Sequence, residues 1–229
     1  MDLSRKLGGR LAVIGGVLAV VGNVIHPRFN GDPVQAYRDV ARSDALVPAN
    51  LLLIVALLLA TVGVMTIAWT LLGGPGRDLA RIGSAAALAG GLLGVLQFGV
   101  ENYAYRQLAR AFASADAADR RGAFWATSAV DHVNSAMFSV WSMLFLGLAP
   151  LLIGLAMMAN RQYPSWLSML GIVGGLICVV VGMVNLVRDD QSTLNIPFLV
   201  GSLLVTAWII ASGALLMRGD GPERAGPAV

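Results

Sequence analysis

The sequence has few charged residues for its length. Asp, Glu, Lys and Arg make up only 13% of its 229 residues, whereas soluble domains carry about 25%. Hydrophobic residues make up 57%, and the mean hydropathy is +0.73. A water-soluble globule of this size cannot bury that much apolar surface. The composition therefore excludes a soluble domain and indicates an integral membrane protein, with the lipid bilayer as its first partner.

The sequence also lacks the residues that several chemistries require. Cys178 is the only cysteine, so no disulfide can form within the chain. Walker A, CxxC and GxSxG motifs are absent, and we expect no cofactor. Two histidines and two carboxylates could ligate zinc or iron, but they show no paired ligand spacing, and we expect no metal. The net charge of +3 comes without a basic cluster that contains aromatic residues, which argues against a nucleic-acid partner.

Six long apolar runs dominate what the sequence does contain. About 20 apolar residues cross a bilayer as a helix. We therefore expect an all-α fold, a polytopic six-helix up-and-down bundle forming one domain over 1–217, with helices at about 8–26, 46–72, 82–104, 129–158, 165–187 and 195–217. Residues 27–45 should form a polar loop and 218–229 a disordered tail. Residues 107–119 should extend the third helix or lie on the membrane surface.

Six spans place both termini on the same side of the membrane. Lys and Arg residues are evenly divided between the two sides, so the count alone does not decide the orientation. Short basic flanks lie on the side of the termini and favour that side as the cytoplasmic one: Arg5, Lys6, Arg10, Arg77, Arg81 and Arg161. We therefore expect a multi-pass protein of the cell membrane with cytoplasmic termini.

Most of the polar side chains in or beside the spans fall at one end of the expected bundle. The ends of helices one, three and five meet the starts of helices two, four and six in an up-and-down arrangement. Those ends hold Asn23, His26, Asn50, Gln97, Glu101, Asp131, His132, Asn134, Asn185 and Asn195. Gln97, Glu101 and Tyr105 recur every four residues and so share a helix face. A shared polar pocket and a ring at headgroup depth are both consistent with this pattern.

These residues suggest acid–base chemistry. A poorly solvated carboxylic acid donates protons near neutral pH, and an imidazole can accept or relay them. Candidate catalytic residues are Glu101, Asp131, His132 and His26. Candidate substrate-binding residues are Asn23, Gln97, Tyr105, Asn134 and Asn185.

The leading hypothesis is an enzyme that cyclises or isomerises an isoprenoid or another hydrophobic small molecule by protonation. Small integral-membrane terpene cyclases are similar in size and in the placement of their acids. The alternatives are a transporter or binding protein, coupled to protons or not, and a structural protein with an interfacial polar ring.

Glycines at four-residue spacing suggest close helix packing. Gly90 with Gly94 and Gly171 with Gly175 are such pairs. Small residues at this spacing let helix backbones approach closely in membranes. A homo-oligomer could form through these glycine-rich faces.

Two stretches resemble a large family of bacterial, chiefly actinobacterial, six-helix membrane proteins. The first runs from Asp32-Pro33-Val34-Gln35-Ala36-Tyr37 through Val47-Pro48-Ala49-Asn50-Leu51-Leu52. The second runs from Gly147-Leu148-Ala149-Pro150-Leu151-Leu152-Ile153-Gly154 through Tyr163-Pro164-Ser165-Trp166-Leu167 to Gly171. The resemblance implies six helices and assigns no activity.

Overall fold

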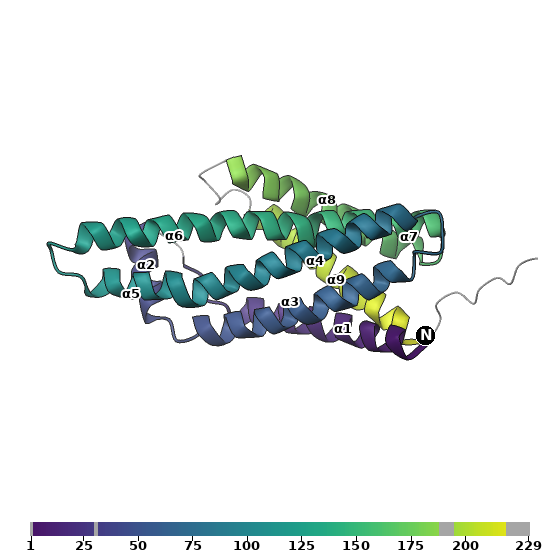
Figure 1. Ribbon diagram of the computed structural model, residues 1–229, viewed down its shortest axis with the longest axis horizontal. Coiled ribbons are helices and arrows are strands. Elements are labelled where there is room, and N and C mark those ends of the chain that lie inside the picture. The colour runs from purple at the N-terminus through teal and green to yellow at the C-terminus, as the bar shows by residue number, and fades with distance from the viewer. Residues whose placement is uncertain (1, 30–31, 188–194, 219–229) are drawn as a thin grey trace, which may run out of the picture.

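The computed structural model describes residues 2–29, 32–187 and 195–218, and the regular structure in these ranges is entirely helical. The elements are α1 (Asp2–Ile25), α2 (Pro33–Arg42), α3 (Leu46–Trp69), α4 (Arg77–Val100), η1 (Glu101–Tyr105), α5 (Arg106–Ser114), α6 (Arg120–Trp141), η2 (Ser142–Leu148), α7 (Ala149–Asn160), α8 (Ser165–Val187) and α9 (Asn195–Arg218). The π-helical segments η1 and η2 join their neighbours into two long continuous helices, α4 to α5 and α6 to α7 (Figure 1).

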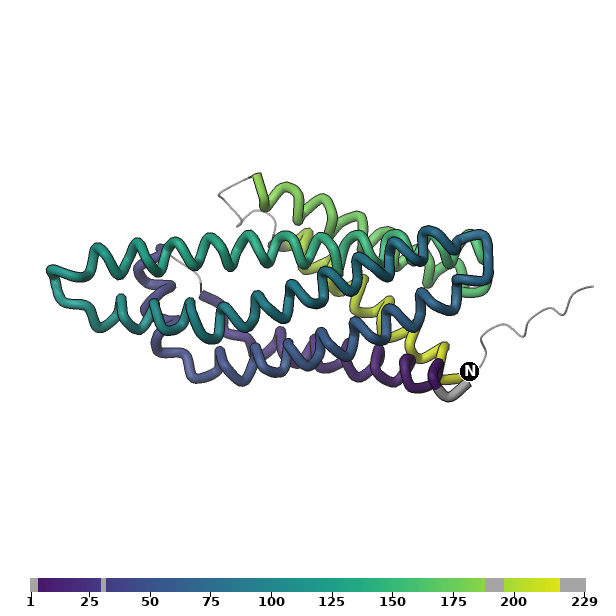
Figure 2. Tube along the Cα trace, in the orientation of Figure 1, coloured from purple at the N-terminus to yellow at the C-terminus, as the bar shows by residue number. Residues whose placement is uncertain are grey.

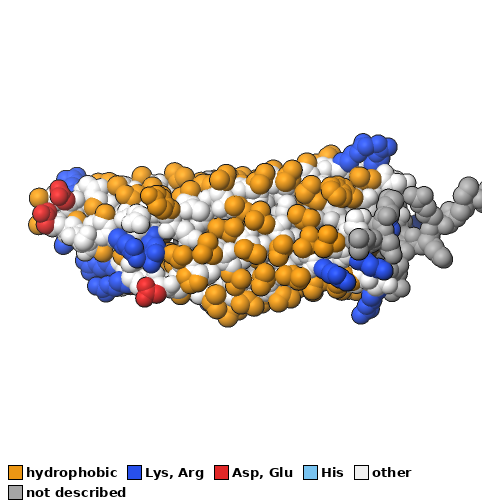
Figure 3. Space-filling view, turned by 60° about the horizontal axis from the view of Figure 1, so that its bottom comes forward, with side chains coloured by type: hydrophobic (Ala, Val, Ile, Leu, Met, Phe, Trp, Pro, Cys, Tyr) orange, Lys and Arg blue, Asp and Glu red, His pale blue; other side chains and the backbone are white. Residues whose placement is uncertain are grey.

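Six helices in the described part of the chain are long and apolar enough to cross a membrane. They cover Ser4–Ile25, Leu46–Trp69, Arg77–Ser114, Arg120–Asn160, Ser165–Val187 and Ile196–Arg218. On the face shown in Figure 3, hydrophobic side chains cover the middle of the molecule, and Lys and Arg side chains gather toward both ends. The predicted all-α, polytopic six-helix bundle is thus confirmed, and the protein is a multi-pass membrane protein. The tail predicted to be disordered lies, beyond Arg218, outside the described residues.

The spans form a ring in chain order. α1 packs against α3, α3 against α4, α4 against α6 and α7, α7 against α8, and α8 against α9. α9 returns to pack against α1, so the last span closes the ring on the first (Figure 2). This order brings the end of α1, the start of α3 and the end of α4 to the same end of the bundle.

Two glycine rows allow α1 to pack against both of its neighbours. Seven residues make about two helical turns, so glycines at this spacing share a face. Gly8, Gly15 and Gly22 face Thr66, Ala60 and Leu53 of α3, and Gly9 and Gly16 face Gly213 and Ile210 of α9. The missing side chains let the backbones approach closely, as small residues do in membrane helix pairs.

The glycine pairs singled out in the sequence also pack within the chain. A Cβ atom on Gly90 or Gly94 would contact Phe145 or Trp141, respectively. On α8, the neighbours of Gly171 and Gly175 include Trp208 and Leu151. These faces are occupied inside the monomer. Homo-oligomerisation stays a prediction, and it would need a different surface.

A small helical layer extends beyond the apolar band. The continuous helices Arg77–Ser114 and Arg120–Asn160 have 38 and 41 residues, about twice what a bilayer requires. Their excess length forms α5 and the first part of α6, and α2 packs against both (Figure 1). We call α2, α5 and residues 120–130 of α6 the cap. Residues 107–114 extend the third span, which was one of the two alternatives predicted for them.

The predicted polar loop at 27–45 was wrong, because it contains α2. Asp32 caps this helix, since its Oδ1 accepts hydrogen bonds from the backbone N–H groups of Val34 and Gln35 at 2.9 and 3.2 Å. Pro33 occupies the first helical turn, where its missing N–H costs nothing. An N-cap aspartate followed by proline is a helix-start signal that the sequence carried.

Tyr37 is the centre of the cap. Its side chain is 1% exposed, and its ring lies 6.1 Å from Tyr105, 5.9 Å from Phe112 and 5.7 Å from Phe124, measured between centroids. Aromatic pairs at such distances add to the free energy of apolar burial. This cluster attaches α2 to the long helices.

Replacing Tyr37 by alanine should therefore release α2 from the cap. We expect the amide protons of α2 to lose most of their protection from hydrogen exchange, while those of the six spans stay protected. Tyr37→Phe, which keeps the ring, should retain most of the protection. Hydrogen exchange read by mass spectrometry checks this expectation. Equal protection of α2 in Tyr37→Ala and the wild type would contradict it.

Candidate functional site

A cluster of polar side chains lies where α1, α3, α4 and α6 meet next to the cap. We call it the polar cluster and define it as His26, Asn50, Gln97, Glu101, Asn102 and Asn134. The chain rises 1.5 Å per helical residue, so the roughly 20 residues between Arg81 and Glu101 span about 30 Å, the thickness of the hydrocarbon core. With Arg81 at one boundary of the membrane, Glu101 would lie near the other, and its side chain is 7% exposed. The polar cluster therefore combines interfacial depth with burial inside the protein.

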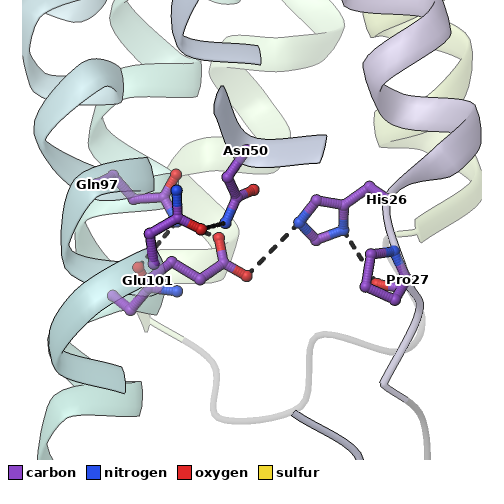
Figure 4. A network of polar contacts seen from close by, with 7 residues as sticks. His26, Pro27, Asn50, Gln97 and Glu101 are labelled. Carbon is purple, nitrogen blue, oxygen red and sulfur yellow. Dashed lines mark hydrogen bonds and ion pairs between the residues drawn. The ribbon is translucent and has the colours of Figure 1, made fainter. Parts of the chain in front are cut away.

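His26 and Glu101 form the centre of the cluster. His26 Nε2 lies 3.6 Å from Glu101 Oε1, and the two side chains point toward each other (Figure 4). His26 Nδ1 lies 3.0 Å from the carbonyl oxygen of Pro27. A carbonyl can only accept, so Nδ1 carries a proton, and the other nitrogen is the one that gains or loses a proton beside Glu101. The pair can hold one proton either as imidazolium and carboxylate or as neutral imidazole and carboxylic acid.

Amide side chains surround this pair. Gln97 Nε2 donates to Glu101 Oε2 at 3.3 Å and to Asn134 Oδ1 at 2.8 Å. Asn50 Nδ2 donates to Asn102 Oδ1 at 3.1 Å. Hydrogen bonds thus connect α3 with η1 and α4 with α6. The hydrogen bond from Gln97 reaches Glu101 Oε2, whereas His26 faces Oε1 of the same carboxyl group.

The π-helical segment η1 carries Glu101, Asn102 and Tyr105. π-helical turns are rare, and they often occur at functional sites. Within η1, Asn102 bonds to Asn50 while the adjacent Glu101 faces His26. Tyr105 is buried in the cap at the other end of the same segment.

The surroundings of His26 raise its pKa above the usual value of 6.5. Burial by itself lowers the pKa of the imidazole, because it disfavours the charged form. The hydrogen bond and the charge of Glu101, together with Pro27 and Asn50, outweigh this effect. The folded protein therefore binds a proton at His26 more tightly than the unfolded chain does.

This shift predicts a pH-dependent contribution to stability. A pKa raised by folding adds stability that is fully present below pH 6.5 and is lost as the pH rises through the higher folded value. We expect the melting temperature of the wild type in detergent to exceed that of His26→Gln by more at pH 5.5 than at pH 8.5. Comparing the melting temperatures of the two proteins at the same pH removes the effect of titrating groups that both proteins share. If the difference in melting temperature between the wild type and His26→Gln were the same at both pH values, the raised pKa of His26 would be contradicted.

Asp131 belongs to a neighbouring contact rather than to the His26–Glu101 pair. Its Oδ2 accepts a hydrogen bond from the hydroxyl of Tyr37 at 3.4 Å, and it also interacts with Tyr105 and, electrostatically, with Glu101. Burial raises the pKa of Tyr37 and the negative charge of Asp131 adds to this, against an opposing effect of Ser128. Tyr37 therefore stays a protonated donor, and Asp131 links the cap to the site.

Three other predicted residues lie outside the polar cluster. His132 is exposed, and its Nδ1 lies 2.6 Å from the carbonyl oxygen of Ser128 in the same helix. Asn23 is exposed and donates to the carbonyl oxygen of Ala19, one turn earlier, at 2.8 Å. Asn185 on α8 has a buried Oδ1 without a hydrogen-bond partner in the described part of the chain. Their predicted roles in catalysis or substrate binding stay predictions.

Two residues of this region were not foreseen from the sequence. Asn102, in the π-helical segment η1, joins the polar cluster through its hydrogen bond with Asn50, and the pattern of polar residues did not single it out. Tyr37 contacts Asp131 because α2 folds onto the cap, and the helix-start signal at Asp32 could have indicated this.

The arrangement suits proton transfer better than metal binding. In the described ranges, no group of three or more His, Cys, Asp or Glu side chains is placed to hold a metal ion. The polar cluster instead offers one carboxyl group, one imidazole and neutral amides that position them. A carboxyl group and an imidazole in contact can act as general acid and general base.

Comparison with known proteins gives one match. The model of a family described as "Domain of unknown function (DUF4386)" matches residues 7–213. This range includes nearly all of the six spans and every residue of the polar cluster. No curated protein and no solved structure matches the chain.

Proposed function

The chain belongs to the DUF4386 family, and we propose that it is a membrane enzyme that performs acid–base chemistry on a lipid-soluble small molecule. The observation that carries this proposal is the contact of 3.6 Å between His26 Nε2 and the buried carboxyl group of Glu101. Other buried side chains of the cluster are neutral amides, which position the pair without supplying a second charge. We expect a lipid-soluble substrate to reach the pair from the bilayer.

The pair can carry out a complete isomerisation without another reactant. In its neutral form, the Glu101 carboxylic acid gives its proton to one carbon of a double bond, whose π electrons form the new C–H bond. His26 Nε2 then removes a proton from a carbon next to the cation, and the C–H electrons form the new double bond. The proton returns from Nε2 to Glu101, so the atoms and charges balance. Cyclisation follows the same course if another double bond attacks the cation first.

Deuterium transfer from solvent tests this proposal. Membranes that contain the protein, incubated in D₂O with a total lipid extract, should yield a lipid-soluble product that has gained deuterium on carbon. Membranes without the protein provide the control, and mass spectrometry provides the readout. If no product differs between the two preparations, the proposed enzymatic function is wrong.

Proton-coupled transport is a second candidate function, and the two π-helical segments favour it. η1 carries Glu101, and η2 lies in the neighbouring long helix. π-helical turns inside helices often occur at functional sites. Here the pair would carry a proton across the bilayer rather than give it to carbon. Proton uptake into proteoliposomes, without any deuterated product, would support this candidate over the enzyme.

We further propose that the termini are cytoplasmic and that the cap lies outside the cell membrane. The basic residues near the start of α1 and near the turn between α3 and α4 support this orientation. Labelling of a cysteine introduced in the exposed part of the cap, in intact cells, tests it. The expected result is that the cysteine is labelled in intact cells. Labelling only after lysis would show the opposite orientation.

A further inference from the structure

A second carboxyl group, that of Asp131 on α6, lies close to Glu101. Gln97 links α6 with η1, because its Nε2 donates both to Asn134 and to Glu101. Asp131 precedes Asn134 by three residues, so it lies about 4.5 Å closer to the cap along α6. The carboxyl groups of Asp131 and Glu101 interact electrostatically. The two acids therefore lie at neighbouring levels where α6 packs against η1.

The two acids differ in their access to water. Glu101 is 7% exposed. The side chain of its partner His26 is 24% exposed, but both ring nitrogens have partners within the protein. Asp131 is partly exposed, and the following residue, His132, is exposed. Ionisable residues in membrane segments often form proton relays between a buried site and water, and Asp131 has the position that such a relay needs.

Tyr105 lies between the two acids. It follows Glu101 by four residues in η1, so the two side chains share a helix face. Its hydroxyl group interacts with the Asp131 carboxyl group and, electrostatically, with Glu101. A phenol hydroxyl can accept one proton while it donates another. Tyr37, whose hydroxyl donates to Asp131 Oδ2 at 3.4 Å, belongs to the cap and not to the helix of Glu101.

We propose that Asp131 is a proton-relay residue, which takes protons from the water beside the cap and passes them through the Tyr105 hydroxyl to Glu101. The neutral carboxyl group of Asp131 gives its proton to the Tyr105 oxygen, while the original Tyr105 O–H bond breaks and that proton goes to the Glu101 carboxylate. The Tyr105 hydroxyl is restored, and a hydronium ion in the water protonates the Asp131 carboxylate again. This inference rests on the proposed function, because it names the route by which the His26–Glu101 pair exchanges its protons with water.

Proton exchange at His26 tests the inference without any substrate. In a His132→Gln background, His26 is the single imidazole, and ¹⁵N NMR follows the exchange of its Nε2 proton with water. Because His26 and Glu101 share a proton, a relay to Glu101 also serves His26. We expect Asp131→Asn to slow this exchange by about tenfold or more, since an acid would be missing from the route. Exchange as fast as in the His132→Gln protein would overturn the inference.

Further variants separate the acid from its structural contacts. Asp131→Asn can still accept the hydrogen bond from Tyr37, and Asp131→Glu keeps an acid, so only the second should restore fast exchange. If Asp131→Glu exchanged as slowly as Asp131→Asn, the loss would be structural and the inference wrong. Asp116→Asn, which removes an exposed acid between α5 and α6, should leave the exchange unchanged.

A variant of the bridging residue keeps the inference testable if Asp131→Asn does not fold. Tyr105→Phe keeps the ring in the cap and removes only the hydroxyl group. We expect it to slow the exchange at His26 as Asp131→Asn does. Unchanged exchange in Tyr105→Phe would overturn the proposed route.

The exchange test and the turnover test fail separately. Without the relay, the proton that His26 removes from one substrate molecule returns to Glu101 and passes to the next, so the product of Asp131→Asn should contain less deuterium than that of the wild type. Slower exchange in Asp131→Asn, without any deuterated product from the wild type, would refute the enzymatic function and leave the relay standing. A deuterated product together with unchanged exchange would refute the relay and leave the proposed function standing.

Discussion

Replacing Glu101 by glutamine should lower the rate of deuterium transfer to the lipid product by a factor of about 10² to 10⁴, the usual contribution of a general acid or base. Glutamine has nearly the same shape and can still accept the hydrogen bond from Gln97. It cannot hold or release the proton that it would share with His26. The fold should therefore persist while the chemistry stops.

The control for this prediction is an acid remote from the cluster. Asp78 is in the first turn of α4, at the opposite end of that helix from Glu101, and its side chain is 89% exposed. Asp78→Asn should leave the rate unchanged. The measurement is the rate of product formation divided by the amount of folded protein. Size-exclusion chromatography in detergent gives that amount. Wild-type rates in Glu101→Gln would remove this residue from the reaction.

Replacing Gly63 by leucine should destabilise the bundle strongly. A Cβ atom on Gly63 would lie 2.5 Å from the Cα atom of Ala12, so a side chain would push the backbones of α1 and α3 apart. Overpacking of a tight core typically costs about 1 to 3 kcal/mol and sometimes more, and at Gly63 the obstacle is backbone rather than a movable side chain. We therefore expect a loss of about 3 kcal/mol or more in the free energy of unfolding and little folded protein in detergent.

The matched control for Gly63 is Gly99. It is exposed on α4, and a Cβ atom there would have no neighbour within 4 Å. Gly99→Leu should melt within a few degrees of the wild type, because its side chain faces lipid. The melting temperature of detergent-solubilised protein measures both effects. Similar melting of the two variants would show that α1 and α3 are not in close backbone contact at Gly63.

The six spans were predictable because the bilayer imposes one simple requirement on the chain. Every backbone polar group in the hydrocarbon must be paired within a helix, and the exposed faces must be apolar. Long hydrophobic runs therefore identify the spans. Chain order then places the ends of the helices, which is why His26, Asn50, Gln97 and Glu101 were expected at the same end.

The details of the site depend on properties that hydropathy does not report. The direction of a side chain depends on the rotation of its helix, and Asn23 turns out to be exposed. The glycine row ending at Gly22 marks the face of α1 that packs on α3, and Asn23 lies about 100° away from it. The hydrogen bond between Asn50 and Asn102 depends on how α3 packs against η1. The pairing of Asp131 with Tyr37 depends on α2, a helix too polar to be found from hydropathy alone.

The proton affinity of His26 tests the central claim most directly. The protein has two histidines, so the exposed His132 can be replaced by glutamine to leave His26 as the single imidazole for ¹⁵N NMR. The account predicts that His26 titrates with a pKa above 6.5 and that this value falls when Glu101→Gln is added. If His26 had the same pKa with and without the Glu101 carboxyl group, the interaction between the acid and the imidazole would be contradicted.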